Sequence, residues 1–192
     1  MFSAMQVEVV EQIPEHHSER VKRLLRQCFG VAAWSAERQR EHADRFCSRA
    51  DTWRHVLAVD GTEGVVGFAT VSRRQLERNG TAIMLGGLGD VCTDPEWRHQ
   101  GIASAVSAAA VEELKRIGCD MAYLCAAVND PGIVRLYGLS GFVPLRRPHT
   151  YFGKSGRLYE DNDAMIAPIC SPAVFNEVLT SSEPFHIGTG NW

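Results

Sequence analysis

Apolar and polar positions alternate with two different periods along the first part of the chain. Residues 6–13 alternate as a strand does, whereas the apolar residues of the segment SERVKRLLRQCF recur at the three- and four-residue spacing of a helix. We expect Ser18 to cap this helix and Gly30 to end it. A second, polar helix is predicted to start at Ser35 and to run through AERQREHADRF.

The middle of the chain has the pattern of strands. Residues 54–60 and 65–71 are predicted to be two strands joined by the turn DGTEG, because an Asp-Gly start favours a hairpin. Residues 81–93, TAIMLGGLGDVCT, are apolar but too rich in glycine for a helix. We therefore expect a third strand there, with an irregularity in it.

Helical and strand patterns then alternate to the end of the chain. The spacing predicts a long helix over residues 100–118, a buried strand over 120–127 and a short helix over 131–139. The segment FVPLR and residues 164–169 are expected to be the last strands, and residues 170–192 show little periodicity. This order of elements predicts an α/β domain built around a mixed sheet.

Composition narrows the class of protein. The 192 residues carry 20 basic and 23 acidic side chains, so the net charge of −3 excludes a strongly cationic nucleic-acid binder. No apolar run approaches the roughly 18 residues of a membrane span, and the N-terminus does not have the pattern of a secretory signal. Six cysteines without a CxxC pair indicate reduced thiols. We expect one cytoplasmic domain over residues 1–192 that binds neither nucleic acid nor a membrane.

The segment TDPEWRHQGIASAV contains a candidate anion site. A strand is expected to end at Thr93, and residues 98–103 open the long helix. The first N–H groups of a helix have no acceptor within the helix, and the helix dipole attracts negative charge. Gly101 presents no side chain to block a ligand, and Ala103 keeps the first turn narrow. Taken alone, the segment fits either an anion site or a loop that Gly101 only shapes.

A second segment further along the chain, NDPGIVRLYGLSGFVPL, contains Asn129, Tyr137 and Gly141-Phe142. Together the two segments resemble the pyrophosphate loop and the Asn…Tyr…Gly-Phe element of the GCN5-related N-acetyltransferases. The resemblance covers residues 86–145. It implies a mixed, mostly antiparallel sheet whose central parallel strands splay apart, flanked by helices.

The resemblance also implies that acetyl-CoA is the cosubstrate. Its pantetheine arm would lie between residues 82–93 and 120–127, and Gly86, Gly87 and Gly89 would leave room for it. The alternative is that these glycines only relieve packing. The cofactor-binding residues implied in this way are Val91, Cys92, Thr93, Arg98, His99, Gln100, Gly101, Ile102, Ala103, Ser104 and Asn129.

Two side chains are candidates for the chemistry. The resemblance assigns Tyr137 as the acid that protects the departing thiolate, by a hydrogen bond more than by full proton transfer, because a phenol has a pKa of about 10 and a thiol of about 8.5. Without the motif, Tyr137 would be read as a packing side chain. Asp90 is the candidate base for the amine. The alternative is that the Asp90 carboxylate only pairs with an arginine or caps backbone groups. One residue of strand register decides whether Asp90 faces the cofactor cleft or the opposite face of the sheet.

The C-terminal third resembles the aminoglycoside 2'-N-acetyltransferases of the same superfamily. The shared features are an acidic run before the last strand, a chain that ends on tryptophan, and the pairs Trp97-Arg98 and Leu136-Tyr137. The resemblance implies an amino sugar acceptor such as kasugamycin, a role in antibiotic resistance, and a tail over residues 170–192 that contributes to the acceptor site. In an ungapped alignment on Trp97-Arg98, the glutamate that this group has on the strand falls on Gly89, beside Asp90. The identity of the base and of the acetylated amine therefore stays open. The acceptor-binding residues implied are Trp34, Gly89, Asp90, Glu160, Asp161, Asp163 and Trp192.

Other functions stay open from the sequence. The acceptor can equally be a polyamine, an antibiotic of another class or a protein N-terminus, and a protein that binds acyl-CoA without catalysis is a further alternative. The seven histidines show no metal-ligand spacing, so we predict no metal. The oligomeric state is also open, and a homodimer is one option.

Overall fold

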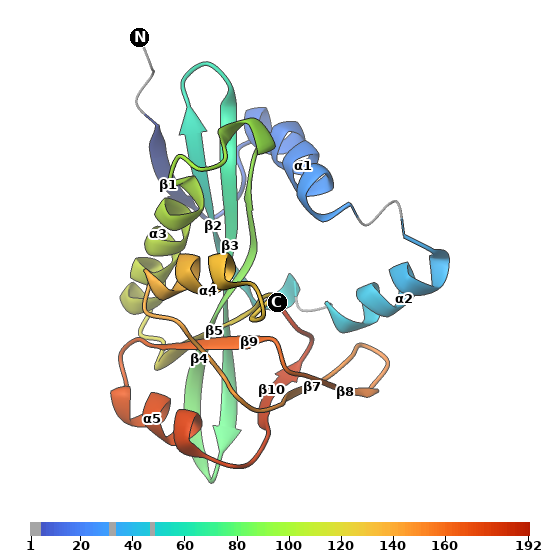
Figure 1. The fold of residues 1–192 in the computed structure, drawn as a ribbon, viewed down its shortest axis with the longest axis vertical. Helices are drawn as coiled ribbons and strands as arrows, with labels where there is room; N and C mark the ends of the chain where they lie inside the picture. Colours follow the sequence, from blue (N-terminus) through green and yellow to red (C-terminus); the bar gives the residue numbers. More distant parts are fainter. Residues whose placement is uncertain (1–4, 31–33, 47–48) are drawn as a thin grey trace.

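The computed structural model describes residues 5–30, 34–46 and 49–192, and it confirms the mixed sheet flanked by helices (Figure 1). All neighbouring strands are antiparallel except the pairs β4–β5 and β10–β7. The large sheet consists, in spatial order, of β1 (Gln6–Val10), β2 (Thr52–Asp60), β3 (Gly64–Arg78), β4 (Thr81–Thr93), β5 (Met121–Cys125), β9 (Ala164–Pro168) and β6 (Val143–Pro144). The small sheet consists of β10 (Phe185–Thr189), β7 (His149–Phe152) and β8 (Leu158–Asp161).

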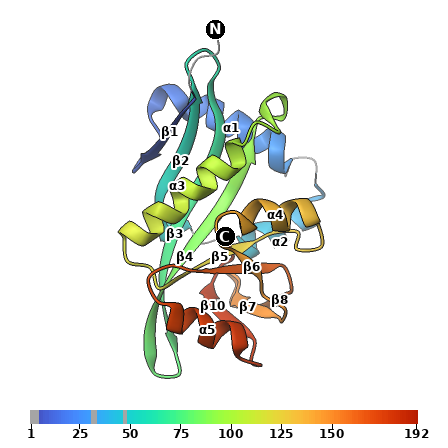
Figure 2. The ribbon, with the colours of Figure 1, turned by 60° about the vertical axis from the view of Figure 1, so that its left-hand side comes forward.

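Helices cover both faces of the large sheet (Figure 2). The alternation of side chains along β2 shows this directly, because Val56 and Ala58 belong to the core under one helix and Leu57 to the core under another. The helices are α1 (Glu15–Phe29), α2 (Ala36–Arg45), α3 (Ile102–Arg116), α4 (Pro131–Gly138) and α5 (Pro172–Thr180). The first core contains the buried residues of α3, and the second contains those of α1.

The predicted β2–β3 hairpin is confirmed, and β3 continues beyond the predicted end to Arg78. In the turn, the buried Asp60 carboxylate accepts hydrogen bonds from the N–H groups of Thr62 and Glu63. The start predicted for α1 is wrong. The helix begins at Glu15, because Pro14 serves as its cap and accepts the N–H of His17, which leaves Ser18 inside the helix.

The final segment is more regular than its weak periodicity predicts. The Ser171 hydroxyl accepts the N–H of Val174 at the start of α5, and β10 pairs with β7. Strands β7 and β8 were also absent from the prediction. All three strands are short, and pairing with distant parts of the chain stabilises them. No helix among the described residues is long and apolar enough to cross a membrane.

Candidate functional site

A β-bulge in β4 opens the large sheet. Phe68 of β3 pairs with Cys92 and Thr70 pairs with Gly89, so Asp90 and Val91 together oppose a single residue. Asp90 has a φ of +52°, and β4 pairs with β5 only over residues 85–87. A bulge bends its strand and ends regular pairing. The predicted irregularity and the predicted splay between the two parallel strands are therefore both present, and the bulge is centred on Asp90.

The first hollow beside this splay is a cavity of about 620 Å³, here called the helix-end cavity. The first hydrogen bond within α3 joins Ala105 N–H to the carbonyl of Gly101, so the N–H groups of residues 102–104 have no acceptor within the helix. Gly101 has a φ of +79°, and a Cβ built there would meet no atom within 4 Å. Glycine is therefore needed for its left-handed backbone and not for space.

Most of the predicted cofactor residues line the helix-end cavity, but Gln100 and Asn129 are exposed and do not line it. Asp130 lines it instead and caps α4 by accepting the N–H groups of Gly132 and Ile133. An aspartate directly before Pro131 is a helix-start signal that sequence reasoning could have used. The predicted residues that line the cavity are Val91, Cys92, Thr93, Arg98, His99, Gly101, Ile102, Ala103 and Ser104, and the lining residues not predicted are Cys28, Phe29, Asp130, Gly132, Ile133 and Leu136.

A second cavity of about 510 Å³, here called the tryptophan cavity, adjoins the first. Phe29, Val91 and Tyr137 line both. The Tyr137 side chain is 8% exposed and packs edge-on against Phe142. Burial raises the pKa of Tyr137 to about 12, so its phenol stays protonated at neutral pH. The other residues that line the tryptophan cavity are Leu25, Arg26, His42, Phe46, Leu88, Gly89, Asp90, Cys125 and Trp192.

Asp90 and His42 are the acid–base candidates of the tryptophan cavity, and both also line a smaller hollow of about 190 Å³. The Asp90 carboxylate accepts a hydrogen bond of 2.9 Å from the Thr70 hydroxyl. The His42 ring stacks on Phe46 and meets Trp34 edge-on. Burial and the Arg45 charge lower the pKa of His42, which leaves a neutral imidazole that can accept a proton. Sequence reasoning assigned no role to His42, because only the fold turns α2 toward β4.

Trp192 lines the tryptophan cavity and packs against the glycines of β4. A Cβ at Gly87 would lie 2.6 Å from Cδ2 of the indole, and a Cβ at Gly86 would lie 2.6 Å from a Leu114 methyl. These two glycines therefore make room for packing, whereas the sequence predicted that they make room for a cofactor. Gly89 does line the cavity, beside Trp192. The Arg74 guanidinium lies over the indole, 4.4 Å from the ring centroid, and this cation–π contact helps to hold the ring in place.

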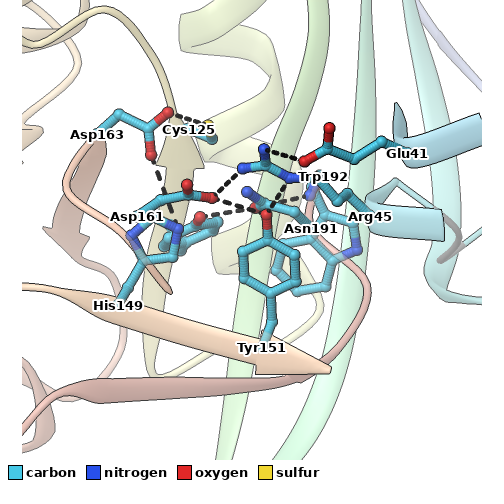
Figure 3. A network of polar contacts seen from close by, with 10 residues as sticks. Glu41, Arg45, Cys125, His149, Tyr151, Asp161, Asp163, Asn191 and Trp192 are labelled. Carbon is cyan, nitrogen blue, oxygen red and sulfur yellow. Dashed lines mark hydrogen bonds and ion pairs between the residues drawn. The ribbon is translucent and has the colours of Figure 1, made fainter. Parts of the chain in front are cut away.

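Asp161 and Asp163 contact neighbouring side chains and line neither of the two large cavities (Figure 3). Asp161 forms an ion pair with Arg45 and accepts the Tyr151 hydroxyl at 2.7 Å. Asp163 accepts the thiol of Cys125, and that cysteine lines the tryptophan cavity. The predicted residues that line none of the described cavities are Trp34, Glu160, Asp161 and Asp163.

Comparison with known proteins gives a family match. The model of the Acetyltransferase (GNAT) family matches residues 18–142. No curated protein matches the chain. Among solved structures, a GNAT family N-acetyltransferase (YhbS) from Escherichia coli in complex with CoA is 16% identical, covers 98% of this chain and 92% of its own, and has a TM-score of 0.61.

Two further structures share the fold. A GNAT family acetyltransferase from Brucella melitensis in complex with acetyl-CoA is 18% identical over 72% of this chain and 83% of its own, with a TM-score of 0.51. A probable N-acyltransferase from Enterococcus faecalis is 18% identical over 76% of this chain, with a TM-score of 0.52. The chain spans 33%, about a third, of the length of that last protein.

Proposed function

Because this chain belongs to the GNAT acetyltransferase family, we propose that it transfers the acetyl group of acetyl-CoA to an amine bound in the tryptophan cavity. The observation that carries this proposal is the position of Tyr137, which lines both this cavity and the helix-end cavity. A protonated phenol at the junction of two adjoining cavities can assist a transfer between molecules held one in each.

The helix-end cavity fits the diphosphate of coenzyme A. Its wall contains the N–H groups that begin α3, the left-handed Gly101 and the Arg98 side chain, and all of these favour an anion. The bound cosubstrate would supply an acetyl thioester, whose transfer releases a thiol. Arg98 and residues 102–104 are the groups of this chain that would hold and orient it.

Tyr137 acts on the sulfur by hydrogen bonding. With its pKa raised to about 12, complete transfer of the phenol proton to a thiolate of ordinary pKa costs roughly 5 kcal/mol. A hydrogen bond to developing negative charge avoids that cost, and it strengthens as the charge grows. Burial of Tyr137 keeps water from competing for the same bond.

Asp90 and His42 divide the work on the amine. An alkylammonium must lose a proton before its nitrogen can attack a carbonyl. The Asp90 carboxylate, exposed at the bulge, attracts the ammonium, and the neutral imidazole of His42 accepts the proton directly or through water. Asp90 remains an alternative acceptor of that proton, as the sequence predicts.

An amino sugar, as in kasugamycin, is the acceptor that we propose first, which would make the protein an antibiotic-resistance enzyme. In support, the tryptophan cavity combines a carboxylate with aromatic rings, and such a site suits a protonated amine on a sugar ring. A second candidate is an amine on an apolar body, favoured by the walls that Leu25, Phe29 and Leu88 contribute. Glu160 and Asp161, which the sequence assigns to the sugar, would have to reach it through a rearrangement of their present contacts.

A thiol-release assay separates these acceptors. Purified protein and acetyl-CoA are mixed with kasugamycin, with larger aminoglycosides, with polyamines and with aromatic monoamines, each over a range of concentration. The amino sugar proposal predicts the highest kcat/KM for kasugamycin or a larger aminoglycoside. A preference for aromatic monoamines favours the second candidate. Calorimetric binding of coenzyme A without thiol release for any amine would contradict catalysis and favour a binding module.

A further inference from the structure

A cluster of three potential metal ligands lies beside the tryptophan cavity and takes no part in the proposed reaction. His149 is the first residue of β7, Asp161 is the last residue of β8, and Asp163 directly precedes β9. One ligand atom from each lies within 4.8 Å of the other two. Figure 3 shows an oxygen of Asp163 turned toward the imidazole and the Asp161 carboxylate beside the ring, where it meets Arg45 and Tyr151.

The imidazole of His149 is buried without a hydrogen-bond partner. Its side chain has 0% exposure, and neither Nδ1 nor Nε2 makes a hydrogen bond. Nε2 points at Oδ1 of Asp163 from 3.7 Å, which is beyond hydrogen-bond distance, and that oxygen is also buried and unpartnered. Unpartnered polar atoms in a protein interior are costly, so two that face each other indicate a missing group between them.

The charges around the cluster favour a cation as that group. Two carboxylates, from Asp161 and Asp163, are opposed by one guanidinium, from Arg45. The imidazole of His149 adds a nitrogen ligand that has no hydrogen-bond partner.

One oxygen of each carboxylate already has a donor. Tyr151 and Arg45 both donate to Oδ2 of Asp161, and the Cys125 thiol donates to Oδ2 of Asp163 at 3.0 Å. Metal-binding carboxylates are usually oriented by hydrogen bonds of this kind. The His149 ring is likewise held in place, because it packs between the rings of Tyr123 and Tyr151.

We propose that His149, Asp161 and Asp163 bind a divalent transition-metal ion, with zinc as the reference ion. One imidazole nitrogen and two carboxylate oxygens are ligands that zinc accepts, at about 2.0–2.2 Å each, and a tetrahedral site places them about 3.4 Å apart. The ligand atoms lie within 4.8 Å of one another, so the cluster reaches that spacing by a contraction of at most about 1.4 Å. The Asp163 side chain is 41% exposed although its Oδ1 is buried, so a movement of this side chain would admit the ion and a water molecule as the fourth ligand.

The ion would act as a structural clamp. Its ligands would join β7 and β8 of the small sheet to the start of β9 in the large sheet. The small sheet also contains β10, which leads into Trp192, and Tyr123 of β5 donates a hydrogen bond to the Asn191 side chain. A bound ion would therefore stabilise the wall of the tryptophan cavity, and this inference does not depend on which acceptor binds there.

The test is metal binding by the full-length chain without coenzyme A or any amine. Protein freed of metal with a chelator is titrated with zinc chloride by calorimetry, and crystals soaked in zinc are measured at the zinc absorption edge. We expect one anomalous peak among His149, Asp161 and Asp163. At a zinc concentration 100 times the Kd, the Tm should rise by about 5–10 °C.

Variants separate this site from the cysteines. Asp163→Asn should weaken zinc binding at least tenfold, and His149→Gln should do the same. His186→Gln is the matched control, because His186 lies on the neighbouring strand β10, contacts Thr150 and is outside the cluster. Unchanged affinity in Asp163→Asn, no calorimetric binding, or an anomalous peak only at thiols would each overturn the proposal. The wild-type crystal experiment decides it even if a variant does not fold.

Discussion

Replacing Tyr137 with phenylalanine removes a phenol hydroxyl from the junction of the two cavities and leaves the ring in place. The ring packs edge-on against Phe142 and is largely buried, so its packing should survive the change. The hydroxyl is the part that would contact the departing sulfur. We therefore expect a large effect on turnover and a small one on folding.

The size of the effect follows from the environment of the hydroxyl. Acid catalysis of this kind contributes about 10²–10⁴-fold, which corresponds to about 3–5 kcal/mol in the activation free energy. The free energy of unfolding should change by less than about 1.5 kcal/mol, because a single neutral hydrogen bond contributes no more than that. Coenzyme A affinity should change little, since Arg98 and residues 102–104, the groups assigned to its diphosphate, are left in place.

The assay is thiol release with the best amine of the screen, together with calorimetric binding of coenzyme A. Tyr159→Phe is the matched control, because the Tyr159 hydroxyl bonds to Asp44 and lines none of the described cavities. A Tyr137→Phe enzyme that keeps kcat within twofold of the wild type would refute the assigned role. Because the pKa of Tyr137 is about 12, wild-type kcat should also show no loss caused by this group up to pH 10. A fall in wild-type kcat near pH 10 that is absent in Tyr137→Phe would refute the claim that burial raises the pKa of Tyr137.

Three further predictions test the rest of the site. The pKa of His42 is below its usual 6.5, so kcat/KM in a pH–rate profile should rise as the imidazole loses its proton and level off near neutrality. In His42→Gln the plateau should be lower and the rise of kcat/KM with pH should be absent. Gly87→Ala should displace the Trp192 indole, cost about 1–3 kcal/mol of stability in denaturant unfolding, and raise the acceptor KM at least tenfold while the Kd of coenzyme A stays the same. Gly101→Ala should weaken coenzyme A binding and lower the free energy of unfolding by about 1 kcal/mol, because only the left-handed backbone is disturbed. The control Gly138→Ala, which adds a methyl group in open space on α4, should leave the free energy of unfolding unchanged or raise it. Equal stability of these two alanine variants would contradict the reasoning on Gly101.

Local signals in the sequence determined the elements that surround the helix-end cavity. The apolar spacing of residues 100–118, the glycine before α3 and the proline at the start of α4 act within a few residues of the chain. They were enough to predict α3, α4, the fold class and most of the helix-end cavity. The glycine-rich run of β4 also predicted an irregular strand, although its pattern did not locate the bulge at Asp90.

Contacts between distant segments were decided only by the tertiary structure. Gly87 looks like a position that admits a cofactor until the indole of Trp192, from the far end of the chain, is seen to fill that space. Asp161 looks like a substrate ligand until Arg45 is found paired with it. His149 and Asp163 have no recognisable ligand spacing, yet strand packing places them 3.7 Å apart.

The physical reason is the range over which each interaction acts. Helix starts, caps and tight turns depend on hydrogen bonds between near neighbours in sequence, so their residues reveal them. Which charge a carboxylate meets, and which ring fills the space above a glycine, depends on strands that pair across the whole chain. The sequence by itself therefore determined the family and most of the helix-end cavity, and only the folded chain decided how the tryptophan cavity is built.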